Sequence, residues 1–87
     1  MNWTVILSRQ AVKDARKLAE SGYKLKAEQL LKLLEVNPYK TPPPYEKLVG
    51  NLSGFYSRRI SIQHRLVYSV SEEQKTVHVL RMWTHYE

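Results

Sequence analysis

Residues 55–83 decide the fold, and they read FYSRRISIQHRLVYSVSEEQKTVHVLRMW. Three runs in this stretch are rich in β-branched and aromatic residues, as strands are: 55–60, 65–71 and 76–83. Polar turns separate the runs and are short enough to connect neighbouring strands directly: 61–64 and 72–75. The C-terminal half therefore predicts an antiparallel meander of three strands.

Upstream of the meander, the sequence predicts one more strand, over residues 3–8, and a first helix. Ser8 can cap a helix that ends near Ser21, and Gly22 favours the turn that stops it. The small and apolar residues of this helix fall on one side: Ala11, Val12, Ala15, Leu18 and Ala19. The basic residues occupy the opposite side: Arg9, Lys13, Arg16 and Lys17.

A second helix is predicted from about Tyr23 to Val36, and the pair Asn37-Pro38 ends it. Its apolar stripe has helical spacing: Ala27, Leu30, Leu31 and Leu34. Residues 38–47 contain three consecutive prolines and predict a stiff connector that positions Glu46.

The predicted element order is β-α-α-β-β-β, an α+β fold with a helical hairpin packed on a mainly antiparallel sheet. A chain of 87 residues fits one domain, 1–87. Cysteine is absent, so no disulfide or thiolate metal site can form. Apolar runs reach only three residues, which excludes a membrane-spanning segment or signal-peptide core and favours a cytoplasmic protein.

The chain is basic, with 14 Lys and Arg against 8 Asp and Glu and a formal net charge of +6. Such a charge is typical of a solvated basic surface and equally of a protein that attracts a polyanion. Nucleic acid and an acidic protein segment are both suitable polyanions, and charge alone does not choose between them.

Meander geometry brings basic residues to one edge of the sheet. The end of the first meander strand carries Arg58 and Arg59, and the start of the second carries Arg65. If the last strand continues beyond Trp83, then Arg81, Trp83 and His85 share a face. We therefore expect arginines and a histidine to converge at this edge.

This set of residues suits metal-independent cleavage of RNA. That reaction needs a base for the 2′-hydroxyl proton, cations for the charge on phosphorus and an acid for the leaving 5′-oxygen. Arginine matches phosphate oxygens with its planar fork, histidine has an unperturbed pKa of about 6.5, and Glu46 is the candidate base.

Structural roles for the same residues stay open at this point. Arg58 and Arg59 also fit solvated strand positions, and Arg65 can simply pair with Glu46 or Glu72. Residues near a C-terminus such as His85 are often frayed. His64 in a turn and His78 in a strand are predicted to be structural.

Four separated blocks of the sequence match one pattern: Glu46-Lys47-Leu48, Asn51 to Ile60, His64 to Tyr68, and the closing His85-Tyr86. With this order and spacing, the chain resembles the YoeB/Txe branch of the RelE/ParE toxin superfamily. The resemblance implies a RelE-like, microbial-ribonuclease-like fold. It also implies a toxin that cuts messenger RNA in the ribosomal A site without a metal or other cofactor, and a cognate antitoxin with an acidic tail.

Carried over residue by residue, the resemblance implies a role for each site position. Glu46 matches the general base, His85 the general acid and Arg65 the phosphate-stabilising arginine. Arg59 matches a second arginine at the phosphate, and Tyr86 a tyrosine that contacts the substrate base.

One departure concerns positive charge in the site. Members of that branch often carry Lys-His between Leu48 and Asn51, where this chain has Val49-Gly50. Lys47, or a residue elsewhere, must then supply substrate-binding charge.

Two other functions remain as alternatives to the ribonuclease. A ParE-like toxin that inhibits gyrase shares the fold but has no expected need for Glu46, Arg65 and His85 together. A non-catalytic RNA-binding module also agrees with the charge and the aromatic residues. The basic side of the first helix, described above, is predicted to bind the backbone of ribosomal RNA.

Overall fold

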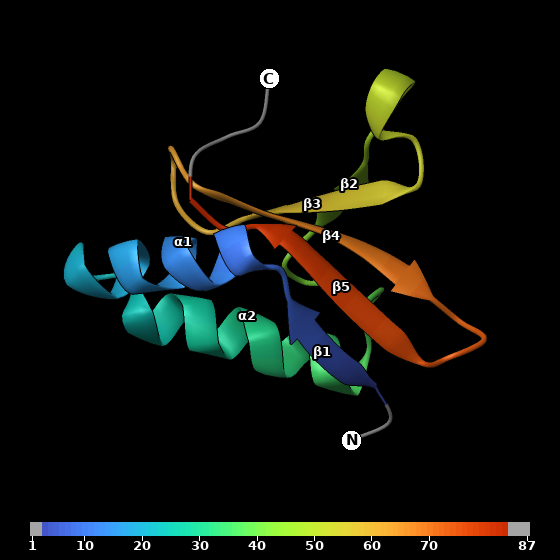
Figure 1. The fold of residues 1–87 in the computed structure, drawn as a ribbon, viewed down its shortest axis with the longest axis horizontal. Helices are drawn as coiled ribbons and strands as arrows, with labels where there is room; N and C mark the ends of the chain where they lie inside the picture. Colours follow the sequence, from blue (N-terminus) through green and yellow to red (C-terminus); the bar gives the residue numbers. More distant parts are fainter. Residues whose placement is uncertain (1–2, 84–87) are drawn as a thin grey trace.

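Apart from one additional strand, the helices and strands follow the predicted order in the computed structural model, which describes residues 3–83. The N-terminal half forms three elements: β1 (Thr4–Leu7), α1 (Arg9–Glu20) and α2 (Lys24–Val36). The C-terminal half forms four strands and a 3-10 turn: β2 (Tyr45–Lys47), η1 (Gly50–Leu52), β3 (Phe55–Arg59), β4 (Arg65–Ser71) and β5 (Thr76–Arg81). The two helices lie side by side and pack on the sheet, which confirms the predicted α+β fold (Figure 1).

The sheet has five strands in the order β1-β5-β4-β3-β2. β3, β4 and β5 form the predicted antiparallel meander, and β1 joins it parallel to β5 with Val5 opposite Val77. β2 was not expected, because three residues after a proline run carry too short a pattern to indicate a strand. It pairs antiparallel with β3 and so turns part of the predicted 38–47 connector into an edge strand.

The first helix begins and ends at the predicted residues. The Ser8 hydroxyl accepts a hydrogen bond from the Ala11 N–H at 3.0 Å, as an N-cap does. Gly22 has a φ of +89°, the left-handed conformation that suits glycine just after a helix. The hairpin geometry is therefore set by local sequence.

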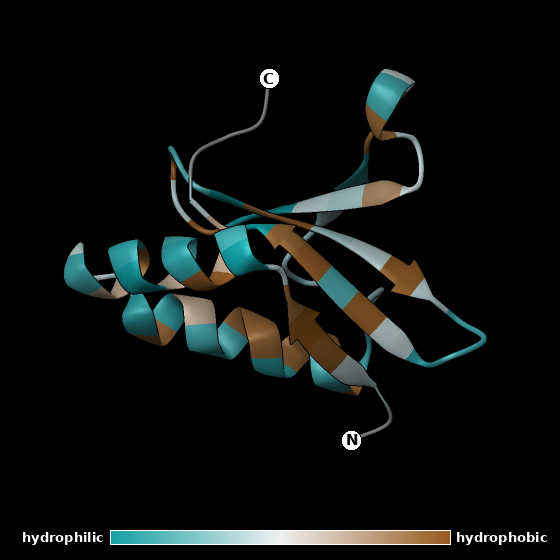
Figure 2. Ribbon diagram, in the orientation of Figure 1, coloured by the Kyte–Doolittle hydropathy of each residue, from teal (hydrophilic) through white to brown (hydrophobic). Residues whose placement is uncertain are grey.

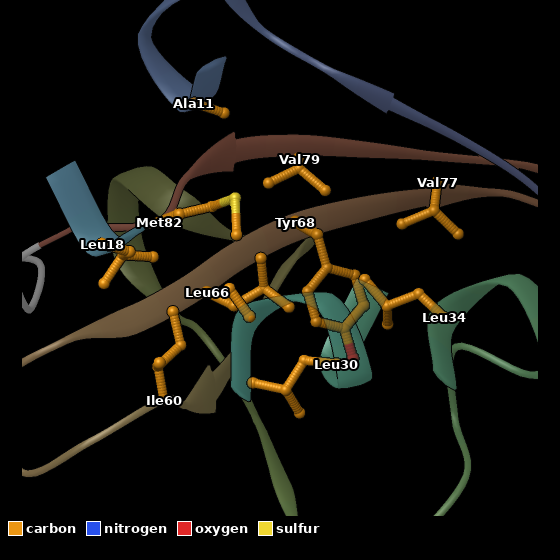
Figure 3. Packing of buried hydrophobic residues seen from close by; sticks show 11 residues of the cluster. Ala11, Leu18, Leu30, Leu34, Ile60, Leu66, Tyr68, Val77, Val79 and Met82 are labelled. Atoms are coloured by element: carbon orange, nitrogen blue, oxygen red, sulfur yellow. The ribbon is translucent and has the colours of Figure 1, made fainter. Parts of the chain in front are cut away.

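The core lies between the helical hairpin and the sheet (Figure 3). Apolar side chains from both helices meet those of the central strands there: Leu18, Leu30, Leu34, Leu66, Tyr68, Val77 and Val79. The stripe predicted for α2 is confirmed, since Ala27, Leu30 and Leu34 are buried and Leu31 is half-buried.

No helix within residues 3–83 is long and apolar enough to cross a bilayer.

The buried side of α1 differs from the prediction. Val12 is 41% exposed and Ala19 is also exposed, whereas Asp14 is fully buried. The Asp14 carboxylate accepts hydrogen bonds from Arg81 Nε and from the Met82 N–H, both at 2.9 Å. Helix α1 is thus rotated about its axis relative to the prediction, so that the Asp14 carboxylate rather than Val12 meets the end of β5.

The pKa of Asp14 reflects this environment. Burial by itself raises the pKa, but the hydrogen bonds from Arg81, the Met82 N–H and Gln10 outweigh it and hold the pKa below the usual range. Asp14 is therefore an ionised anchor at the point where β5 ends.

β5 is shorter than the predicted strand and ends at Arg81. Its register with β4 shifts, because Tyr68 lies opposite Val79 while Val67 lies opposite Arg81, which leaves Leu80 unopposed. A bulge of this kind breaks strand alternation. Arg81, Trp83 and His85 were expected to share a face only if the strand continued beyond Trp83. It ends at Arg81, so this condition is not met, and His85 lies outside the described residues.

Arg58 is buried, contrary to the expectation that it joins the basic edge or stays solvated. It is 1% exposed, and its guanidinium donates to the carbonyls of Pro38 and Pro43 and to the Tyr68 hydroxyl. Burial also raises the pKa of Tyr68, partly offset by the Arg58 charge. Arg58 therefore fastens the proline-rich loop to the sheet.

Candidate active site

A groove of about 520 Å³ opens where β3 ends and β4 begins. Four charged side chains line it: Lys26, Glu46, Arg59 and Arg65. The rest of the lining comes from Pro43, Pro44, Ser57 and residues 60–62 of the β3–β4 turn. The groove holds three basic groups against one carboxylate, so it attracts an anion.

Strand register explains why these residues from separate strands face the same groove. Glu46 of β2 lies opposite Ser57 of β3, and Arg59 of β3 lies opposite Arg65 of β4. Ser57 and Arg59 are two positions apart on one strand and so point to the same face. The sequence-based expectation that Arg59 and Arg65 converge is met by this geometry, and β2 brings Glu46 beside them.

Glu46 and Arg65 are in direct contact. Arg65 Nη1 donates to Glu46 Oε1 at 3.0 Å and to Ser57 Oγ at 3.5 Å. The Arg65 side chain is 28% exposed and that of Glu46 is 68% exposed. A carboxylate and a guanidinium therefore stand side by side, with the carboxylate open to solvent.

Arg59 is exposed and forms no ion pair with another residue of the 3–83 range. Its guanidinium is thus available to an incoming anion at the mouth of the groove. The neighbouring Arg58 points to the opposite face of β3, into the contacts described above.

Lys47 lies outside the groove. It is opposite Tyr56 in the sheet, whereas Glu46 is opposite Ser57, so the two side chains point to opposite faces of β2. Val49 and Gly50 also lie outside the groove lining; Val49 is 82% exposed, and Gly50 begins η1 with a φ of +70°.

Lys26 of α2 is the lining residue that sequence reasoning missed. It is exposed, lies in the first turn of α2, and lines the groove. Nothing in the local pattern distinguishes it from the other lysines of α2, because its place in the site depends on how the helix packs on the sheet. It supplies positive charge in a site where Val49-Gly50 supplies none.

Two predicted site residues, His85 and Tyr86, lie outside the described residues. The other two histidines have different surroundings. His64 is buried against Trp83, as expected for a structural residue, while His78 is exposed on β5. Within residues 3–83, no three His, Cys, Asp or Glu side chains lie close enough together to hold a metal ion.

The four basic residues of α1 all lie on its exposed surface, where hydrophilic residues predominate (Figure 2). Arg9 and Lys13 extend into solvent, and Arg16 borders a shallow apolar groove between the helices. The Lys17 ammonium lies 5.7 Å from the centre of the Trp83 ring. None of the four lines the Glu46–Arg65 groove.

Comparison with known proteins gives consistent results. The family model for the YoeB-like toxin of bacterial type II toxin-antitoxin systems matches residues 8–86. Toxin YoeB of Escherichia coli (strain K12) is 39% identical over 56 residues, which are 64% of this chain and 67% of that protein.

Solved structures agree with these matches. The YoeB/ParE toxin from Agrobacterium tumefaciens superposes with a TM-score of 0.86 at 25% identity, over 95% of this chain and 99% of that one. The toxin of the heterotetrameric YoeB-YefM complex from Staphylococcus aureus gives 0.80 at 31% identity, over 99% and 100%. The chain therefore belongs to the family of YoeB-like toxins of bacterial type II toxin–antitoxin systems.

Proposed function

We propose that this toxin is an endoribonuclease that cleaves messenger RNA in the ribosomal A site by attack of a 2′-hydroxyl group, without a metal ion. The observation that carries the proposal is the 3.0 Å contact between Glu46 and Arg65 in a groove with excess positive charge. Family membership supports it. The proposal includes a cytoplasmic location, because the target is the translating ribosome.

The proposed chemistry assigns one task to each group. Glu46 takes the proton of the 2′-hydroxyl, whose oxygen then bonds to phosphorus while the bond from phosphorus to the 5′-oxygen breaks. Arg65 and Arg59 bind the non-bridging oxygens and stabilise the charge that develops on them. The products are a 2′,3′-cyclic phosphate and a 5′-hydroxyl.

The leaving oxygen needs a proton, and we assign its delivery to His85. Tyr86 is assigned to the base of the nucleotide at the cut. Both roles rest on the family pattern of a closing His-Tyr pair. An imidazolium beside a scissile phosphate is a suitable acid because histidine exchanges a proton near neutral pH.

A defined message on translating ribosomes tests the function. We expect one cut within the codon in the A site, with a 5′-hydroxyl on the downstream fragment, and no cut when the nucleotide before it is 2′-deoxy. Fragments ending in 5′-phosphate, or cleavage of the 2′-deoxy message, would contradict the mechanism. Intact RNA together with loss of gyrase supercoiling activity would indicate a ParE-like inhibitor instead.

Metal independence needs a test that leaves the ribosome intact. A phosphorothioate replaces one non-bridging oxygen of the scissile phosphate by sulfur, which weakens a contact from a metal ion to that atom. A thiophilic ion such as Mn²⁺ restores cleavage when the contact exists. We expect that Mn²⁺ does not restore the rate on the phosphorothioate message. Restoration selective for that message would contradict the proposed chemistry.

Lys26 is expected to contribute to binding of RNA rather than to the chemical step. Replacing Lys26 by Gln should raise the concentration of ribosome-bound message at which cleavage is half-maximal by up to about fivefold. This is the effect expected from the loss of one exposed ion pair. The maximal rate should stay close to wild type. Lys32→Gln is the matched control, since Lys32 is exposed on the same helix but outside the groove. Equal behaviour of both variants would remove Lys26 from the site.

The basic side of α1 is proposed to bind ribosomal RNA. The triple replacement of Arg9, Lys13 and Arg16 by Ser should weaken ribosome binding and flatten its dependence on salt by roughly 0.7–0.9 in log–log slope for each lost phosphate contact. The melting temperature should stay unchanged, because these side chains are exposed. An unaltered slope would show that this side is only solvated.

The partner is proposed to be an antitoxin with an acidic tail, by analogy with the YoeB-YefM complex from Staphylococcus aureus. A groove with three basic groups offers such a tail direct ion pairs with Arg59 and Arg65. Binding there blocks the phosphate site, and displacement of His85 and Tyr86 is the alternative route to inhibition. Full cleavage activity of the saturated complex would exclude both routes.

A further inference from the structure

His64 makes a distinctive pair of contacts with Trp83. The imidazole stacks on the indole, with ring centres 4.1 Å apart and an angle of 23° between the planes. In addition, His64 Nδ1 is hydrogen-bonded to the Trp83 main-chain carbonyl. A carbonyl oxygen only accepts, so Nδ1 carries the proton and donates. One residue thus fixes both the side chain and the backbone of Trp83.

His64 is itself held firmly. Its carbonyl accepts the N–H groups of Ile60 at 2.8 Å and Ser61 at 3.1 Å, and its own N–H donates to Ser61 Oγ at 3.2 Å. The Tyr23 ring packs edge-on against the imidazole, with centres 5.4 Å apart. With only 6% of its surface exposed, the side chain has little freedom to move.

The chain on the near side of Trp83 is anchored as well. Asp14 holds the Met82 N–H at 2.9 Å, and Met82 is fully buried. The Trp83 carbonyl is therefore the second of two consecutive main-chain anchors, and His85 follows two residues later in the sequence. In the other direction, His64 directly precedes Arg65, the first residue of β4.

We propose that His64 is a positioning residue: by holding Trp83, the last residue that the structure describes, it sets the point relative to Arg65 from which His85 acts. The inference rests on the proposed function, because it assigns His64 an effect on the acid step. His64 is not itself an acid or base in the reaction, since its Nδ1 proton is committed to Trp83 and its side chain does not line the groove.

The variant His64→Phe tests the proposal, because it keeps an aromatic ring and removes the donor. Misplacing a reacting group by about 1 Å costs up to roughly 10²-fold in rate, so we expect single-turnover cleavage to fall at least about tenfold. In a His85→Gln background the same change should alter the residual rate by less than about twofold, because the group being positioned is gone. His78→Phe, at an exposed histidine of β5, is the matched control and should cleave at the wild-type rate.

The variant His64→Asn gives a second readout. Its amide nitrogen lies near the position of Nδ1 and donates to the same carbonyl, so this variant should recover most of the rate lost in His64→Phe. If His64→Phe does not fold, Trp83→Leu, which removes the stacked ring, takes its place. Its effect is then compared in the wild-type and His85→Gln backgrounds. For either variant, a loss of cleavage rate that occurs only in the protein with His85 supports the proposal.

The results separate this inference from the function on which it rests. An equal loss with and without His85 would overturn the positioning role, as would a His64→Phe protein at the wild-type rate beside an inactive His85→Gln. An Asn variant as slow as the Phe variant would overturn the role of the hydrogen bond. Wild-type protein that leaves RNA intact, or His85→Gln at full rate, would overturn the proposed function and this inference together.

Discussion

Replacing Arg65 by alanine should slow single-turnover cleavage by about 10²- to 10³-fold, the effect of removing one preorganised donor from the charge that develops in a transition state. Arg65 is only 28% exposed and is held by both Glu46 and Ser57, so its guanidinium is oriented before RNA arrives. Saturating toxin over ribosome-bound message isolates this step from binding. The loss should therefore appear in the rate constant rather than in the concentration dependence.

Arg65→Lys and Lys47→Ala sharpen this test. A lysine keeps the charge but loses the fork that binds two phosphate oxygens, so Arg65→Lys should remain at least about tenfold slower than wild type. Lys47 is exposed and faces away from the groove, so Lys47→Ala should cleave normally. Wild-type cleavage by Arg65→Ala would mean that another cation stabilises the phosphate, and the proposed mechanism would need a different centre.

Replacing Arg58 by methionine should destabilise the fold by about 2–4 kcal/mol, because polar groups that met the guanidinium stay buried without it. Met fills much of the same volume but cannot donate to the Pro43 carbonyl or the Tyr68 hydroxyl. For a domain of this size, the melting temperature should drop by roughly 10–20 °C. Thermal or urea unfolding followed by circular dichroism measures the change.

Arg59→Met is the matched control for Arg58→Met, since it is the same substitution one residue along the strand. Arg59 is exposed, so its loss should shift stability by less than about 0.5 kcal/mol while slowing cleavage. The two variants are thus expected to separate stability from activity. Equal melting temperatures would show that the buried guanidinium contributes nothing to the fold.

The sequence predicts most of the fold because its patterns are long and local. The alternation over residues 55–81 and the apolar patterns of the two helices each extend over many residues, so these elements and their order agree with the structure. β2 is three residues long and gains its identity only by pairing with β3. The burial of Asp14 could not be predicted from the pattern of α1, because its hydrogen-bond partners, Arg81 and Met82, lie far away in the sequence.

The site was partly predictable for the same reason. Arg59 and Arg65 meet because meander strands bring their ends together, which follows from local patterns. Arg58 and Arg59 are chemically identical neighbours, and the proline-rich loop and Tyr68 on one face of β3 distinguish them. Lys26 reaches the groove through helix packing, which no short stretch of sequence encodes.

The parallel pairing of β1 with β5 has a consequence for how the protein is made. Thr4 to Leu7 are synthesised early, yet their partners in the sheet are Thr76 to Val79. The same late strand supplies Val77 and Val79 to the core, so the hydrophobic layer stays open until these residues emerge. A nascent chain cannot finish folding while β5 is still inside the ribosome. The hydrophobic layer of this toxin therefore closes only after β5 has left the ribosome.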